Sequence, residues 1–291
     1  MGKSSDSCRC PTATKRIDTV ISEQEFSSQL RSAIEQNKIT LPTLPEVALK
    51  IRDAVETDSS TAQQIADMVT TDAALSARLL QVANSPLYRG RVQIENIQMA
   101  VTRLGQKLVR SLVVSLAMKQ IFQATSDTLD TRLRAIWEES VQVAAISRAL
   151  AQTVGLNREQ AMLAGLIHNI GSLPILTMAD SFPELMSDPK TLDSYVEHLS
   201  PDIGKLILQT WGFSEALVKV AENYRNLNYD GGPAADYVDV VQVARLQVVE
   251  DAGPEWMLAP AFRKLGLEPE AEVIEIEGVA DDVDEVRQIL L

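Results

Sequence analysis

Apolar residues recur at helical spacing through most of the chain, and this pattern restricts the fold more than any other feature. Segments such as TAQQIADMVT (61–70) and AALSARLLQVAN (73–84) carry apolar side chains at positions i, i+3, i+4 and i+7. Residues that favour helix starts accompany them: Ser60 or Thr61 can cap the first segment, and Asp72 can cap the second. The sequence therefore predicts an all-α protein.

Longer segments continue the same pattern into the second half of the chain. Residues 107–122 are apolar on most faces, which is typical of a helix surrounded by other helices. A long amphipathic helix is predicted from about Thr131 to Thr153, with Gly155 placed as its C-cap. The valine-rich segment 237–250 fits either a strand or a buried helix, and its position after so many helices favours the helix.

Composition excludes several classes of protein. With 45% hydrophobic residues the chain can build a sizeable core, which argues against intrinsic disorder. No uncharged apolar run approaches the roughly 20 residues that a membrane span requires. A formal net charge of −13 disfavours general nucleic-acid binding. Cys8 and Cys10 make neither a disulfide framework nor a closed zinc site, so we expect a cytoplasmic protein.

The two ends of the chain differ from its body. Residues 1–20 are rich in serine and threonine and are expected to form a flexible tail. The C-terminal extension, 251–291, is acidic: from Glu268 onward it holds nine acidic residues and one basic residue. We interpret this extension as a solvated amphipathic helix packed on the body, with a docking segment for a basic partner as the alternative.

Few residues are available for catalysis. The sequence contains no Walker-type phosphate loop, no GxGxxG after a strand and no GxSxG motif. The only histidines are His168 and His198. Taken alone, His168 has the surroundings of a core histidine, because its helix is otherwise apolar. His198 precedes a helix start predicted at Ser200 and is expected to be a partly exposed surface residue.

The segment around His168 resembles a known metal-binding motif. AGLIHNIG (164–171) is similar to the AGLLHDIG of HD-superfamily phosphohydrolases, in which adjacent histidine and aspartate residues hold a metal ion. Here Asn169 stands in place of the aspartate.

Three segments of the N-terminal half resemble the HDOD family, the HD-related output domains. They stand in the family's order and are LPTLPEVALKI (41–51), IADMVTTDAALSARLLQVANSPLY (65–88) and IQMAVTRLG (97–105). The resemblance covers about residues 35–250. It implies a fold in which an N-terminal helical half, 21–125, packs on a degenerate HD-like half, 126–250. It also implies a regulatory role in bacterial signalling, exerted through protein–protein interaction rather than catalysis.

The resemblance also locates the positions at which catalytic relatives hold metal. Four of these five positions carry a residue that differs from the ligand of catalytic relatives; in chain order the five are Glu139, His168, Asn169, Ser200 and Arg245. Glu139 takes the place of a histidine, and Arg245 takes the place of the last aspartate. A further histidine pair of the relatives falls near Asn223-Tyr224, where neither residue is histidine.

This set of residues is poorly suited to a metal ion. Asn169 removes a negative charge, Ser200 is a weak ligand, and Arg245 would repel a cation. We therefore expect neither metal nor any other cofactor, with a residual single-metal site through Glu139 and His168 as the alternative. Glu139 is expected to serve a structural role, accepting a hydrogen bond from His168 or pairing with Arg245.

The sequence is compatible with three functions. The favoured one is a non-catalytic signalling domain that binds signalling proteins in trans, with no membrane and no direct nucleic-acid contact. The alternatives are an HD-type metal-dependent phosphohydrolase and a module that reuses the old pocket for a nucleotide or cyclic dinucleotide. Arg103, Lys107 and Arg110 lie near a helix start that could attract phosphate, although ordinary surface charge is the commoner explanation.

Overall fold

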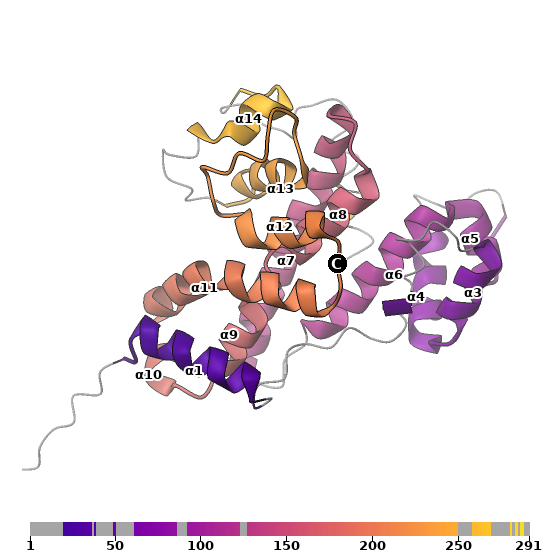
Figure 1. Cartoon of the computed structure of the whole chain (residues 1–291). Helices are drawn as coiled ribbons and strands as arrows, with labels where there is room; N and C mark the ends of the chain where they lie inside the picture. Colours follow the sequence, from indigo (N-terminus) through magenta and orange to yellow (C-terminus); the bar gives the residue numbers. More distant parts are fainter. Residues whose placement is uncertain are drawn as a thin grey trace, which may run out of the picture.

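The computed structural model describes residues 20–36, 38, 49–50, 61–85, 92–122, 127–249, 258–268, 280, 283–284 and 286–287. Within these ranges every extended regular element is a helix (Figure 1), which confirms the all-α prediction. The cysteines, the segment 41–48, Tyr88, all but Val20 of the expected tail and most of the acidic extension lie outside the described residues.

Helices α3 to α6 form one lobe, here called the N-terminal lobe (Figure 1). The predicted caps are present: the Thr61 side chain accepts from the Gln64 amide in a capping box, and Asp72 accepts from the amides of Ala74 and Leu75. These bonds satisfy amide groups that the first turn leaves without helical partners. The bounds of the helices are α3 Ala62–Thr70, α4 Ala73–Ala83, α5 Ile97–Leu104 and α6 Gln106–Ile121.

Two of the motif residues in this lobe have clear structural roles. The side-chain amide of Asn84 donates to the backbone oxygen of Ile94 at 2.8 Å and accepts from the Ile94 amide at 2.8 Å, which ties the end of α4 to the start of α5. Gly105 has a φ of +82° between α5 and α6, a conformation that favours glycine.

The remaining helices form the C-terminal lobe around a hairpin of α7 and α8. Gly155 ends α7 with a φ of +72°, as predicted. The two helices cross closely, because a Cβ added at Gly165 would lie only 2.6 Å from the Cα of Ala144. The helices of this lobe are α7 Asp127–Thr153, α8 Arg158–Ile167, α9 Ser172–Ala179, α10 Pro183–Met186, α11 Pro189–Thr210, α12 Glu215–Asn223, α13 Tyr237–Leu246 and α14 Pro260–Leu265.

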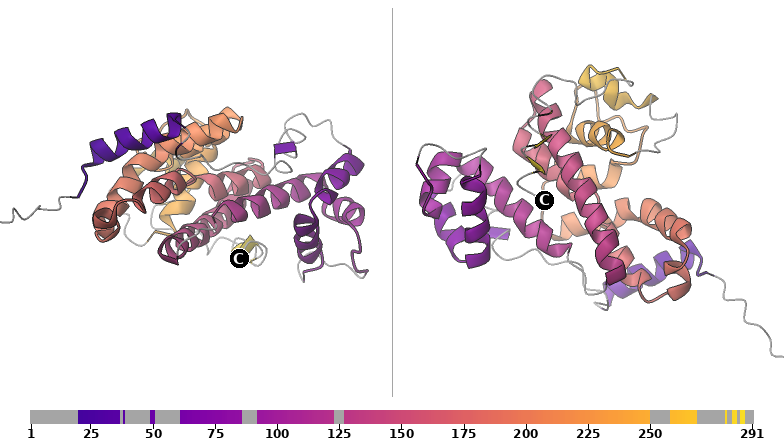
Figure 2. Two further views of the ribbon diagram at one scale, coloured as in Figure 1. Left: turned by 90° about the horizontal axis from the view of Figure 1, so that it is seen from below. Right: turned by 180° about the vertical axis from the view of Figure 1, so that it is seen from behind.

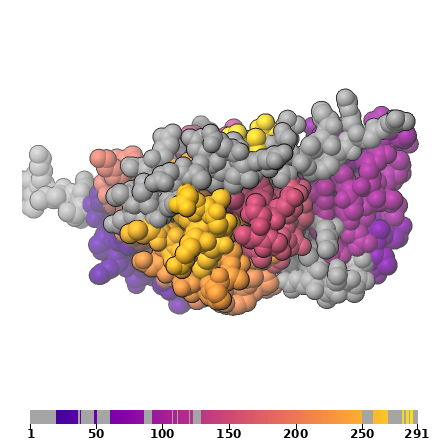
Figure 3. Space-filling model, turned by 90° about the horizontal axis from the view of Figure 1, so that it is seen from above, coloured from indigo at the N-terminus to yellow at the C-terminus, as the bar shows by residue number. Residues whose placement is uncertain are grey.

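The two lobes meet where α6 packs against α8. Most of the buried apolar side chains of both lobes belong to one continuous cluster. The valine-rich segment is helical, as α13, and α14 packs on it. In the space-filling view α14 (gold) lies on the surface of the C-terminal lobe (Figure 3).

Helix α1 (Glu23–Glu35) packs on the C-terminal lobe, although its sequence position groups it with the N-terminal half. Figure 2 shows it running beside α11, far from α3 to α5. The ring of Phe26 lies 5.5 Å from that of Tyr195, and Arg31 forms an ion pair of 2.9 Å with Asp202.

The helix start predicted at Ser200 is wrong. Helix α11 begins at Pro189 and runs through Pro201 without interruption. Proline inside a helix removes one backbone donor. Buried apolar residues on both sides of this point, including Leu192 and Ile207, hold the helix together through tertiary packing.

One described stretch, Arg158–Ala179, is long and apolar enough to cross a membrane by length and composition alone. It comprises α8, the turn after it and α9, and 89% of its most apolar window is buried inside the protein. Such burial is typical of a core helix in a soluble protein.

Candidate functional site

His168 occupies the turn between α8 and α9 and is completely buried. Its Nδ1 lies 2.6 Å from the backbone oxygen of Gly165. Since a carbonyl can only accept, this contact assigns the ring proton to Nδ1. Burial is the main cause that lowers the pKa of His168 to about 3, and the nearby Arg245 and Arg225 lower it further, while the bond to Gly165 opposes the shift. The imidazole is therefore neutral at physiological pH.

Tyr224, the C-cap of α12, closes the space beside this imidazole. Its ring meets that of His168 edge-on, with centroids 4.9 Å apart. Its hydroxyl donates to Oδ1 of Asn169 at 3.0 Å and accepts from Nε of Arg225 at 3.0 Å. The side-chain oxygen of Asn169, at the position of the metal-binding aspartate in the resembling proteins, is thus engaged within the protein.

Two arginines flank the same tyrosine. The guanidinium carbons of Arg225 and Arg245 lie 5.2 and 5.7 Å from the ring centroid of Tyr224. Arg225 pairs with Glu197 at 2.8 Å, whereas Nε of Arg245 lies 3.9 Å from Oε1 of Glu139. Burial, followed by repulsion from Arg225, lowers the pKa of Arg245.

The backbone of Ser200, in α11, packs against the turn that carries His168. A Cβ added at Gly171, in the turn that carries His168, would lie 2.1 Å from the Ser200 carbonyl oxygen and 2.6 Å from the Gly204 amide. The helix and the turn can therefore approach only because residue 171 is glycine. The Ser200 hydroxyl is buried and finds no hydrogen-bond partner within the described ranges.

The structure tests the structural role expected of Glu139. A hydrogen bond from His168 to Glu139 does not form, because Nδ1 faces Gly165 and Nε2 has no hydrogen-bond partner in the described part of the chain. Glu139 stands beside Arg245 instead, at a distance of an ion pair but beyond that of a good hydrogen bond. Of the two alternatives, the pairing with Arg245 is the one that the structure contains.

The residues of this site do not fit a two-metal centre. The described part of the chain contains no group of three or more histidine, cysteine or acidic side chains that could hold a metal ion. Asn169 is already hydrogen-bonded to Tyr224, and the carboxylate of Glu139 faces a guanidinium. A divalent cation here would meet the repulsion of Arg245 and too few anionic ligands.

The structure brings together more residues than the sequence comparison singled out. The only sequence signal for the role of Tyr224 is its departure from the histidine of the catalytic relatives. Arg225 and Glu197 carried no signal of their own. His198 lies apart from the site: its side chain is 59% exposed and its Nδ1 is 3.0 Å from a carboxylate oxygen of Glu23 on α1.

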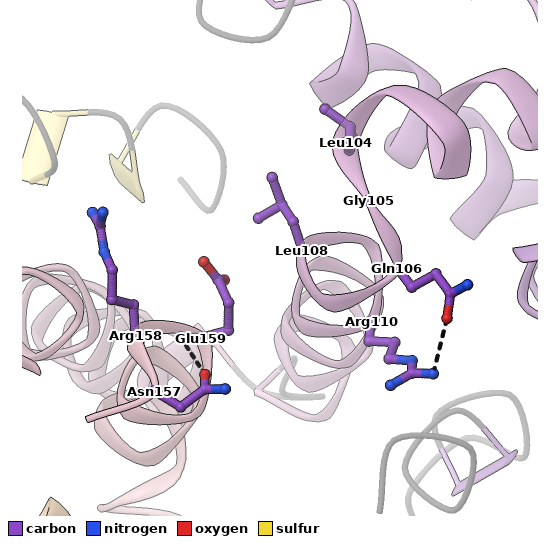
Figure 4. Close-up of a pocket in the computed structure, with 8 residues that line it drawn as sticks. All are labelled: Leu104, Gly105, Gln106, Leu108, Arg110, Asn157, Arg158 and Glu159. Atoms are coloured by element: carbon purple, nitrogen blue, oxygen red, sulfur yellow. Dashed lines mark hydrogen bonds between the residues drawn. The ribbon is translucent and has the colours of Figure 1, made fainter. Parts of the chain in front are cut away.

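A separate cavity of about 660 Å³ lies between the start of α6 and the connection from α7 to α8 (Figure 4). Arg110 lines it, is buried, and donates to Gln106 at 3.3 Å. Arg103 does not line it, since its guanidinium donates to the backbone oxygen of Val92. The side chain of Lys107 is not among those described. Of the two arginines whose side chains are described, one therefore lines the cavity and the other does not.

Comparison with solved structures identifies helical proteins of the same fold. A Shewanella amazonensis protein, named as a proposed metal-dependent phosphohydrolase, is 32% identical, with a TM-score of 0.77 over 92% of this chain and 99% of that one. An HDOD domain protein of unknown function from Geobacter sulfurreducens is 20% identical, with a TM-score of 0.66 over 92% of this chain and 99% of that one. A proposed signal transduction protein from Marinobacter aquaeolei is 22% identical, with a TM-score of 0.67 over 94% of this chain and 67% of that one.

The sequence comparisons agree with this fold. An uncharacterized protein of Treponema pallidum is 22% identical over 242 residues, which are 77% of this chain and 45% of that protein. The chain thus spans about half the length of this relative. The family model of the HDOD domain matches residues 41–227, which include the turn with His168 and the phenol of Tyr224. The chain belongs to the HDOD family.

Proposed function

We propose that this protein is a non-catalytic signalling domain that acts by binding other proteins. The observation that carries the proposal is the hydrogen bond from Tyr224 to Asn169, which occupies the side chain at the position of a metal-binding aspartate. Metal catalysis requires anionic ligands that are free to bind the ion, whereas the described side chains at these positions are engaged with one another.

The association with signalling is supported by the family and by the name of one relative. The chain is an HDOD protein, and the Marinobacter relative with the same fold is named as a proposed signal transduction protein. In this proposal the domain works in the bacterial cytoplasm and meets its partners in trans.

The competing candidate is a metal-dependent phosphohydrolase. It is favoured by the name of the Shewanella protein, which is 32% identical. The side chains present oppose it, because the carboxylate of Glu139 is paired with Arg245 and the amide of Asn169 with Tyr224. His168, the one histidine at these positions, is neutral, and its Nδ1 donates to the backbone carbonyl of Gly165.

An activity assay separates the two candidates. The full chain is incubated with manganese or iron(II) and with a generic phosphate ester or a cyclic dinucleotide, beside the variant His168→Ala. The proposal predicts no hydrolysis above that of the variant. Turnover by the wild type that the variant loses would contradict it.

A second assay tests the binding of proteins. Partners captured from a bacterial extract are purified and titrated into the chain by calorimetry. A saturable complex of fixed stoichiometry is expected, and its affinity should be unchanged after treatment with a chelator. If every purified candidate fails to bind, the protein-binding part of the proposal is wrong.

A further inference from the structure

Two positive charges meet at one buried phenol in this site. Arg225 and Arg245 both have their guanidinium carbons within 6 Å of the centroid of Tyr224. Their side chains are only 19% and 14% exposed. Like charges in such a poorly hydrated place repel one another strongly, because the local dielectric is lower than that of water.

The surrounding groups compensate these charges unequally. Arg225 has a close carboxylate, Glu197 at 2.8 Å, and a hydrogen bond to Tyr224. Arg245 has Glu139 at 3.9 Å, and its buried Nε has no hydrogen-bond partner among the residues that the structure describes. The neutral His168 adds no charge of either sign. A buried guanidinium donor without an acceptor costs free energy that a suitable ligand would recover.

An oxyanion with several acceptor atoms matches this need. The planar fork of arginine suits phosphoryl groups, to which it can donate two parallel hydrogen bonds. We propose that Arg245, together with Arg225, binds the phosphoryl group of free phosphate or of a small phosphate ester. The two guanidinium groups then supply the positive charge that metal ions supply in catalytic relatives. This inference rests on the part of the proposed function that leaves the site without metal.

Glu139 is the competitor within the site. Its carboxylate oxygen lies 3.9 Å from Nε of Arg245, so a bound phosphoryl group would have to displace it or tolerate its charge. Removing that charge should therefore strengthen binding, whereas removing the guanidinium of Arg245 should weaken it. These opposite effects from two neighbouring residues distinguish a specific site from general attraction to a protein surface.

The test titrates inorganic phosphate, and separately adenosine monophosphate, into the full chain by calorimetry at constant ionic strength. Arg245→Gln is expected to weaken phosphate binding at least about tenfold, the effect of one lost charge-assisted hydrogen bond. Glu139→Gln is expected to strengthen it several-fold. Arg31→Gln, which removes an exposed arginine paired with Asp202, is the matched control and should leave binding unchanged. Tighter binding of the nucleotide than of phosphate would identify an ester as the ligand, and equal binding would identify the phosphoryl group alone.

Several outcomes would overturn the inference. Absence of phosphate binding would do so, and so would an equal loss in the Arg31 and Arg245 variants. If Arg245→Gln does not fold, Arg245→Lys is tested in its place. Lysine keeps the positive charge but lacks the planar fork of the guanidinium group. Undiminished phosphate affinity in Arg245→Lys would contradict the proposed phosphate site. Binding that disappears after treatment with a chelator would show that a metal carries it, and both this inference and the proposed function would then fail. Absence of binding in a metal-free protein refutes the inference alone.

Discussion

The hydroxyl of Tyr224 donates to the side-chain oxygen of Asn169 at 3.0 Å, across 55 residues of sequence. The same hydroxyl accepts from Arg225. This phenol therefore joins the end of α12 to the turn after α8 at the place where catalytic relatives would be expected to bind metal. An internal hydrogen-bond network stands where an open coordination shell would otherwise be needed.

Tyr224→Phe tests the contribution of this network to stability. The change leaves Asn169 Oδ1 and Arg225 Nε without their partner, and we expect the free energy of unfolding to fall by about 1–3 kcal/mol. Urea denaturation followed by circular dichroism measures it. Tyr237→Phe, which removes a more exposed hydroxyl bonded to Gln160, serves as the control and should cost less. Equal effects of the two changes would argue against a special role for Tyr224.

Gly171→Ala tests the close approach of α11 to the turn that carries His168. The φ of Gly171 is −64°, so alanine meets no conformational penalty and the effect is steric. Because the added Cβ would lie 2.1 Å from the Ser200 oxygen, we expect a loss of about 3 kcal/mol or more, or failure to fold. Gly204→Ala, whose Cβ would contact Ala221 at 3.3 Å, should be much milder. A small effect at residue 171 would mean that the turn and α11 do not pack this closely.

His168 should make stability depend on pH. Its folded-state pKa is lowered from 6.5 to about 3, so the unfolded chain binds a proton at pH values where the folded chain does not. The resulting stability is fully present above pH 6.5 and is lost as the pH falls towards 3, with a limiting slope of about 1.4 kcal/mol per pH unit. Denaturation of the wild type and of His168→Gln at pH 5 to 7 measures this. Parallel curves for the two proteins would show that the histidine is not buried as described.

Lys264 should anchor α14 to the C-terminal lobe. Its side chain is 3% exposed, and Nζ lies 3.2 Å from a carboxylate oxygen of the fully buried Asp239 and 3.1 Å from one of Asp230. Lys264→Met leaves Asp239 as an uncompensated buried charge, and we expect destabilisation of about 3–5 kcal/mol. Adding Asp239→Asn to that variant should restore part of the loss. A double variant no more stable than the single one would contradict the pairing.

Local signals in the sequence predicted local structure well. The caps at Thr61 and Asp72 and the glycine after α7 follow from chemistry within a few residues, and the structure contains all three. The prediction failed at Ser200, where Pro201 is typical of a helix start but packing on both sides continues the helix.

The site was only partly predictable, because several of its contacts join segments that are distant in the sequence. The resemblance of AGLIHNIG to the HD motif places His168 and Asn169 together in the site, since they are adjacent in the chain. It could not show that Tyr224 bonds to Asn169 or that α1 packs on the C-terminal lobe, because these contacts join distant segments and leave no periodic pattern.

The metal content of the purified protein tests the central claim most directly. The full chain is expressed in medium supplemented with manganese and iron, purified without chelators and analysed by inductively coupled plasma mass spectrometry. We expect well under one equivalent of any transition metal per chain, with the same trace content in His168→Ala. One or two equivalents in the wild type, lost in that variant, would contradict it.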